Sequence, residues 1–270
     1  MWKVSCSLPF VRVRDNYQWI KDSTPLILVA IGLLAGWELL SRVGKIPRYI
    51  APAPSASVIA IIRSAPSFGK HTWVTLQEVL LGMLVGSSLG FVLGVVIVYS
   101  KKIKMALYPI MVVSQTVPVI ALAPILVVWF GFGIGPKIAL VALVTFFPIT
   151  VATADGLVSV DSELLRFIRS LGATEWQMFW KIRLPSALPF ILTGVKVSAT
   201  YCVVAAVIGE FIGAFYGLGA LMMQSIHMLY MDVLYGTVII MSAMGITLYT
   251  FVTLLERIFV PWHIERRRKI

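Results

Sequence analysis

Long apolar runs separated by short basic stretches constrain this chain more than any other feature of its sequence. The 270 residues are 59% hydrophobic and only 13% charged, with a mean hydropathy of +0.92. A typical soluble domain is about one quarter charged, so this chain lacks the charge to coat a globular surface around so much apolar material. Soluble enzymes, disordered tails and disulfide scaffolds are therefore excluded, and lipid must surround most of the chain.

Six apolar runs are candidates for membrane-spanning helices, since about 20 helical residues cross ~30 Å of hydrocarbon. We place them at 25–40, 76–99, 105–130, 137–154, 188–213 and 233–260. Glycines spaced by four, from Gly82 to Gly94, give the second run a flat face for close helix packing. Pro109, Pro118 and Pro124 interrupt the third run, and backbone freed by proline at membrane depth must be surrounded by protein or a water-filled cavity. The third run is therefore predicted to be inner, path-lining structure.

The distribution of basic residues predicts that both termini are cytoplasmic. The N-terminal segment holds four Lys or Arg residues, the 100–104 turn three, the 157–187 connection four and the C-terminal end five. The alternate loops hold six, of which five lie in 41–72 and the sixth is Lys137. Because basic residues accumulate on the cytoplasmic side, the net charge of +11 reports orientation in the membrane rather than binding to nucleic acid.

These spans divide the chain into five segments. Residues 1–24 are expected to be a cytoplasmic segment, and they lack the marks of a cleaved signal peptide. Residues 25–43 are expected to form the first transmembrane helix, and residues 44–72 an external loop. Residues 73–260 are expected to form a domain of five transmembrane helices that includes the 157–187 connection, and residues 261–270 a basic cytoplasmic tail. Cys6 and Cys202 lie in polar and apolar surroundings respectively and are expected to be free thiols.

The long 157–187 connection carries the signals of two short helices joined at a glycine. Asp161 or Ser162 can cap the first helix, and Gly172 provides a left-handed stop. The apolar positions of this first helix recur at one face, at Leu164, Ile168 and Leu171. Thr174 and Gln177 form a capping box that opens the second helix, which Pro185 is expected to end. Two interpretations stay open: an amphipathic hairpin on the inner leaflet, or a docking element for a cytoplasmic partner.

At these residues the sequence resembles the EAA loop of ABC importer permeases. That loop has a glycine, nine intervening residues, an isoleucine, any residue and Leu-Pro, a pattern that fits Gly172, Ile182, Leu184 and Pro185. The Glu-Ala-Ala positions fall at Arg166-Phe167-Ile168, where this sequence departs from the pattern. Further matches are Gln115-Thr116-Val117-Pro118, Ala121-Leu122-Ala123-Pro124, Trp129-Phe130-Gly131-Phe132-Gly133, Gly209-Glu210-Phe211, Gly217-Leu218-Gly219 and Leu255-Glu256-Arg257.

Over about residues 37–262 the chain resembles the nitrate, taurine, alkanesulfonate and bicarbonate branch of these permeases, which includes importers of pyrimidine precursors and riboflavin. The resemblance implies an all-α membrane protein with six transmembrane helices and the type I ABC importer (MetI-like) fold. It implies a homodimer of permease copies in the cell inner membrane, two cytoplasmic ATPase subunits and an external substrate-binding protein. ATP and Mg²⁺ would belong to the ATPase, so the chain itself is expected to be neither an enzyme nor a cofactor-binding protein.

The resemblance also assigns residue roles. ATPase coupling is expected at Leu165, Arg166, Ile168, Leu171, Gly172, Ala173, Trp176, Ile182, Leu184 and Pro185. Independently of the resemblance, polar residues and a proline within the apolar runs are candidate positions along the translocation path, at Gln115, Thr116, Pro118, Thr200, Tyr201 and Glu210. The polar side chains among them could instead form interhelical hydrogen bonds, worth about 0.6 kcal/mol on average. Glu210 could either gate the path or accept backbone N–H groups from the 213–219 turn, and Lys196 is expected to snorkel to the cytoplasmic headgroups.

Two other classes of membrane protein fit the sequence less well than an importer subunit does. A self-sufficient channel or secondary transporter would favour intramembrane charge pairs or inverted repeats, and no repeat is evident in the sequence. A membrane-embedded enzyme would need clustered His, Asp or Glu residues, yet His71, His227 and His263 are scattered without metal-ligand spacing. The sequence therefore favours a permease driven through alternating access by a separate ATPase, and leaves the solute open.

Overall fold

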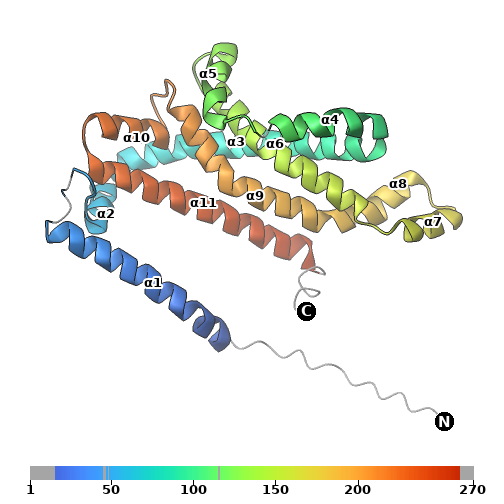
Figure 1. The fold of residues 1–270 in the computed structure, drawn as a ribbon, viewed down its shortest axis with the longest axis horizontal. Helices are drawn as coiled ribbons and strands as arrows, with labels where there is room; N and C mark the ends of the chain where they lie inside the picture. Colours follow the sequence, from blue (N-terminus) through green and yellow to red (C-terminus); the bar gives the residue numbers. More distant parts are fainter. Residues whose placement is uncertain (1–15, 45–46, 48, 115, 262–270) are drawn as a thin grey trace, which may run out of the picture. The chain divides into compact units, whose positions relative to one another are not determined.

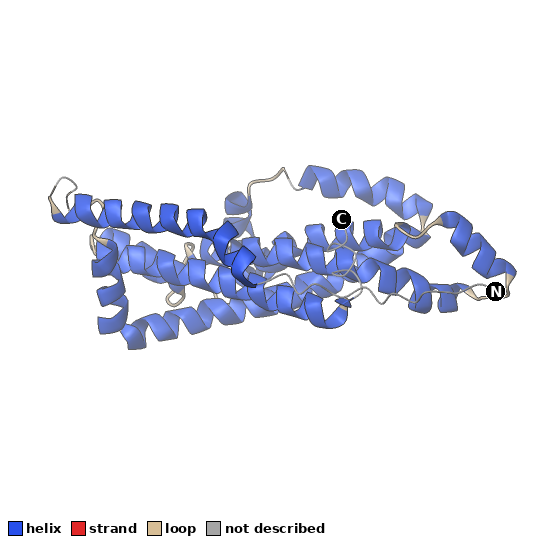
Figure 2. Ribbon diagram, turned by 90° about the horizontal axis from the view of Figure 1, so that it is seen from below, coloured by secondary structure: helices blue, strands red, loops and turns tan. Residues whose placement is uncertain are grey.

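The computed structural model describes residues 16–44, 47, 49–114 and 116–261. Every regular element within these residues is helical (Figure 2). The chain forms two compact units, residues 1–56 and residues 57–270.

The first unit contains α1 (Asn16–Arg42), which begins nine residues before the predicted first span. Glu38, near the end of α1, ties the helix to the segment that follows it. Its Oε1 accepts hydrogen bonds from Arg42 Nε at 2.6 Å and from Ser55 Oγ at 2.6 Å, and its Oε2 accepts one from the Ser55 backbone N–H at 3.1 Å. The predicted 44–72 loop is in part helical, because α2 (Pro54–Arg63) lies within it.

The second unit is built around four long helices that run side by side (Figure 1). They are α3 (Ala65–Tyr99), α6 (Gly135–Val158), α9 (Leu184–Glu210) and α11 (Met231–Phe259). The α9 helix is continuous with α8 (Glu175–Met178) and the π-helical turn η1 (Phe179–Arg183), so that 36 residues form one rod. Among the residues with described placements, these four helices are long and apolar enough to cross a membrane.

The glycine stripe of α3 packs directly against α6, as its spacing predicts. Gly82, Gly86, Gly90 and Gly94 are all buried. A Cβ on Gly86 would lie 1.9 Å from Thr145 Oγ1 and 2.4 Å from the Ala142 carbonyl oxygen. The two backbones therefore approach so closely that no larger residue fits, which is how helices associate in lipid without a hydrophobic driving force between them.

The second and third expected spans differ most from the helices of the structure. The 76–99 run belongs to a helix that already begins at Ala65. The 105–130 run is two helices, α4 (Lys101–Ser114) and α5 (Val119–Phe130), of ~21 and ~18 Å at 1.5 Å per residue. The break falls at Pro118, whose φ of −60° and ψ of 122° are extended, because proline removes a helix hydrogen bond and fixes φ. Neither helix alone reaches ~30 Å.

The two ends of the bundle carry different short helices (Figure 1). The α7 helix (Ser162–Ser170) and α8 lie at one end, and α10 (Leu218–His227) lies at the other. Cys202 is a buried free thiol in the packed core of α9, as expected, while Cys6 and the basic tail from residue 262 onward lie outside the described residues.

Candidate functional site

The bend between α7 and α8 has the geometry that its sequence predicts. Asp161, rather than Ser162, caps α7 by accepting a hydrogen bond from the Glu163 backbone N–H at 2.8 Å. Gly172 has a φ of +88°, a left-handed conformation that side chains with a Cβ rarely adopt. The N–H of Ala173 then reaches back 3.4 Å to the carbonyl of Ile168 and closes the end of α7.

The second helix opens with the predicted capping box. The Thr174 hydroxyl accepts a hydrogen bond from the Gln177 N–H at 3.3 Å, and the Gln177 side chain accepts one from the Thr174 N–H at 2.9 Å. An ion pair between Arg169 and Glu175 spans the bend. The expectation that Pro185 ends this helix is wrong: α8 continues through the π-helical turn η1, which ends two residues before Pro185, into α9 without a break.

One side of this segment is anchored to the bundle. Met178 is only 1% exposed, and the Phe179 ring centroid lies 6.2 Å from that of Tyr99 at the end of α3. The other side is apolar and open to the surroundings, since Leu171 is 71% and Trp176 70% exposed. None of the nine residues of α7 is buried. The segment is thus held firmly at its base while it presents an apolar surface away from the bundle.

The predicted coupling residues all fall on this one structure. Leu165, Arg166 and Ile168 lie on α7, Leu171, Gly172 and Ala173 in the bend, Trp176 on α8, Ile182 in η1, and Leu184 and Pro185 in the first turn of α9.

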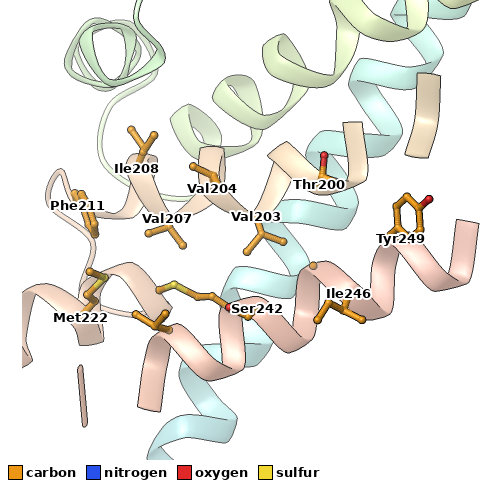
Figure 3. A pocket seen from close by; sticks show the side chains of 13 residues that line it. Thr200, Val203, Val204, Val207, Ile208, Phe211, Met222, Ser242, Ile246 and Tyr249 are labelled. Carbon is orange, nitrogen blue, oxygen red and sulfur yellow. The ribbon is translucent and has the colours of Figure 1, made fainter. Parts of the chain in front are cut away.

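The predicted path residues are not gathered in one place. Thr116 and Pro118 lie between α4 and α5, Thr200 and Tyr201 lie exposed on α9, and Gln115 is outside the described residues. Of this set, Thr200 lines a groove of about 650 Å³ between α9 and α11, closed at one end by Phe211 and Met222 (Figure 3).

The groove has an almost wholly apolar lining. Val203 and Val207 point from α9 toward α11 (Figure 3). The hydroxyl groups of Thr200, Ser242 and Tyr249 are the polar side-chain atoms among its lining residues. This volume falls within the range of small-molecule sites, which is about 300–1,000 Å³.

Glu210 lies in a different environment, at the end of α9 where the chain turns into α10. It is 1% exposed. Its Oε1 accepts a hydrogen bond from Thr75 Oγ1 at 2.6 Å and its Oε2 accepts one from the Gly219 N–H. Of the two roles considered for Glu210, acceptance of a backbone N–H from the 213–219 turn is therefore observed, and the gating role stays a prediction. The N–H of Leu218 donates to Thr75 Oγ1 at 2.8 Å, so the turn is fastened to α3.

Two buried ion pairs join neighbouring helices in the part of the chain that the structure describes. Lys137 Nζ of α6 lies 3.0 Å from Glu78 Oε1 of α3, with side-chain exposures of 10% and 1%. Lys196 Nζ of α9 lies 2.6 Å from Glu256 Oε2 of α11, with exposures of 14% and 11%. The first pair contradicts a sequence expectation, because Lys137 is buried in a helix rather than in an external loop. The second gives Lys196 a carboxylate partner, Glu256, that the sequence did not predict, and the expected snorkelling of Lys196 stays a prediction.

Sequence reasoning singled out neither Glu78 nor the pairing of Lys196 with Glu256. The sequence nevertheless contains a signal for these residues. An ionisable residue inside an apolar run is unusual, and it indicates either a buried partner or a transport pathway. No group of three or more His, Cys, Asp or Glu side chains could hold a metal ion within the described residues.

Known proteins similar to this chain are transport permeases. Residues 82–264 match the family described as binding-protein-dependent transport system inner membrane component. The chain is 36% identical to the formylaminopyrimidine transport permease protein ThiX of Halalkalibacterium halodurans, over 93% of this chain and 98% of ThiX. It is 31% identical to the riboflavin transport system permease protein RibX of Chloroflexus aurantiacus, over 94% and 95% of the two chains.

The fold has a counterpart among solved structures. A chain of the inward-facing MetNI methionine ABC transporter superposes with a TM-score of 0.62 at 21% identity, covering 70% of this chain and 94% of that one. The chain therefore belongs to the binding-protein-dependent transport system inner membrane component family: it is the permease subunit of an ABC transporter, whose ATP is hydrolysed by a partner ATPase.

Proposed function

We propose that this permease crosses the membrane six times with both termini in the cytoplasm, pairs with a second copy of itself, and binds its ATPase on residues 157–187. In this arrangement α1 and the broken α4–α5 segment add two spans to the four long helices. Broken helices are tolerated at membrane depth where protein or a water-filled cavity surrounds them. The burial of Lys137 strengthens the proposed orientation, because one basic residue fewer remains in the loops assigned to the outside.

The observation that carries this proposal is the exposed apolar side of the α7–α8 segment. Partner proteins often bind the apolar face of an amphipathic helix when that face packs against nothing in its own chain. The α7 helix meets this condition, because none of its residues is buried. The rod from Glu175 to Glu210 connects this surface to the membrane core without a break. Movement of the ATPase would therefore tilt α9, because packed helices switch between discrete arrangements rather than deforming smoothly.

Replacing Gly172 by valine is expected to release the ATPase while the permease still inserts and folds. The φ of +88° is strained for a residue with a Cβ, by about 1–2 kcal/mol. Nothing lies within 4 Å of an added Cβ, so the effect would come from the backbone and not from a clash. The measurement is the ratio of ATPase to permease after affinity purification from membranes.

Gly172→Asn is the matched control, since asparagine tolerates the left-handed region, and it should retain the ATPase at close to the wild-type ratio. Equal retention by the valine and asparagine variants would count against a coupling role for this bend.

The proposed orientation can be tested by thiol labelling in a background without Cys6 and Cys202. In permease expressed without its ATPase, so that the docking surface is uncovered, a cysteine at Leu171, which is 71% exposed, should react with a membrane-impermeant maleimide only after the cells are opened. A cysteine at Phe215, which is 89% exposed in the turn before α10, should react in intact cells. The reverse pattern would overturn the orientation and with it the docking surface.

For the solute, we propose an uncharged heterocycle of the kind named for ThiX, passing along a path to which Thr200 contributes. The groove beside Thr200 offers hydroxyl groups and no charged side chain, so it has nothing to neutralise a sulfonate in a low-dielectric setting. In proteoliposomes that contain the whole importer with its binding protein, uptake of a formylaminopyrimidine should exceed that of an aliphatic sulfonate at equal concentration. The opposite preference would refute this solute class.

A self-sufficient channel or secondary transporter has one observation in its favour, which is the presence of two buried ion pairs. Each pair joins two packed helices, however, and so serves equally as a structural brace. Uptake by the permease alone, without the ATPase and ATP, would support that second candidate.

A further inference from the structure

The Lys196–Glu256 ion pair lies at a position that the docking surface alone does not explain. Lys196 is twenty residues beyond Trp176 on the same continuous rod, or ~30 Å along its axis at 1.5 Å per residue. Glu256 is three residues before the end of α11. The pair therefore ties the last turn of α11 to the middle of the rod.

The surroundings of the pair show how α11 is held. It packs against α9 and α10 and only slightly against α3. Beyond the pair, toward α10, the groove partly separates α9 from α11, and its lining begins one turn from Lys196 at Thr200. On the packed side, Leu248 and Val252 belong to the same buried cluster as Ala199 and Val203. The ion pair thus joins α9 and α11 next to the groove that partly separates these two helices.

We propose that the Lys196–Glu256 ion pair transmits the tilt of α9 to α11, so that both helices move together when the ATPase closes. Lys196 and Glu256 are then positioning residues of the transport cycle. This inference rests on the proposed ATPase docking at 157–187, since that is where the movement would begin.

The burial of the two charges explains why the pair would hold together while the helices move. Each charge is almost fully removed from solvent, and separating them would leave an ammonium and a carboxylate unpaired in an apolar setting. Leucine and valine contacts can slide along a helix, whereas a charge pair at 2.6 Å fixes one point on each helix relative to the other. An α11 that is linked in this way has to follow α9, and the groove between them keeps its width.

The experiment uses the purified permease–ATPase complex in lipid nanodiscs, with Cys6→Ser and Cys202→Ala as background. Spin labels are placed at Ser88 of α3 together with either Val197 of α9 or Leu254 of α11, all of which are exposed. Pulsed electron spin resonance then measures both distances without nucleotide and with ATP and vanadate. In the otherwise unaltered complex, both distance distributions should shift.

In Glu256→Gln and in Lys196→Gln, the Ser88–Val197 shift should persist and the Ser88–Leu254 shift should be lost. Exchanging the charges, with Lys196→Glu and Glu256→Lys together, should restore it, which a role in folding alone would not predict. Arg257→Gln removes an exposed neighbouring charge and should leave both shifts unchanged.

A Ser88–Leu254 shift that survives in both single variants would overturn the inference and leave the docking proposal standing. Absence of the Ser88–Val197 shift in the unaltered complex would instead refute the docking proposal on which the inference rests.

Discussion

Replacing Gly86 by leucine is expected to abolish recovery of folded permease. The missing side chain of Gly86 is what allows α3 to lie against α6, because an added Cβ would come within 1.9 Å of Thr145 Oγ1 and 2.4 Å of the Ala142 carbonyl oxygen. Overpacking a well-packed core costs about 1–3 kcal/mol where side chains can shift, and more where the obstacle is backbone. Size-exclusion chromatography in mild detergent should show aggregate in place of a monodisperse peak.

Gly69→Leu provides the matched control, since Gly69 lies on the same helix and nothing is found within 4 Å of an added Cβ. This variant should elute as the wild type does and unfold within a few degrees of it. Aggregation of both leucine variants would show that a leucine on α3 is harmful wherever it is placed, and that the contact with α6 does not explain the effect, because helix propensity alone favours leucine over glycine.

The sequence predicts this packing well because it depends on local spacing. Four glycines at intervals of four must share one helix face, whichever helix they meet. The same holds for the α7–α8 bend, where caps and a left-handed glycine act over a few residues. These local signals predict the bend itself, whereas the prediction that it binds an ATPase comes from the resemblance to the EAA loop.

Contacts between distant segments could not be predicted in this way. The position of Lys137 at the edge of an apolar run predicts a loop residue, and only the fold brings it to Glu78, 59 positions earlier in the chain. Lys196 and Glu256 are 60 residues apart, and their pairing depends on how α11 packs against α9.

The three prolines of the third run are visible in the sequence, but the sequence does not show which of them ends a helix. Pro109 and Pro124 lie inside α4 and α5, and the break falls at Pro118.

Replacing Lys137 by methionine is expected to destabilise the permease strongly. Methionine fills a similar space, but the change leaves the Glu78 carboxylate without its cation at 1% exposure. Removing one member of a buried ion pair typically costs about 3–5 kcal/mol, because the remaining charge is left uncompensated. Unfolding by SDS in mixed micelles should therefore occur at a clearly lower detergent fraction than in the wild type.

The double variant Lys137→Met, Glu78→Met distinguishes two causes of instability: a Glu78 carboxylate left without its cation, and the absence of an ion pair between α3 and α6. Replacing both members of a buried ion pair by apolar residues of similar volume is often neutral or stabilising, so most of the lost stability should return. Glu210 also lies close to Glu78 and to the Lys137 charge, so the double variant removes the cation near Glu210 as well, whereas the hydrogen bonds from Thr75 and Gly219 to Glu210 involve neither substituted residue. A double variant as unstable as Lys137→Met would show that removing the orphaned Glu78 carboxylate is not enough, and that Lys137 also compensates the buried Glu210.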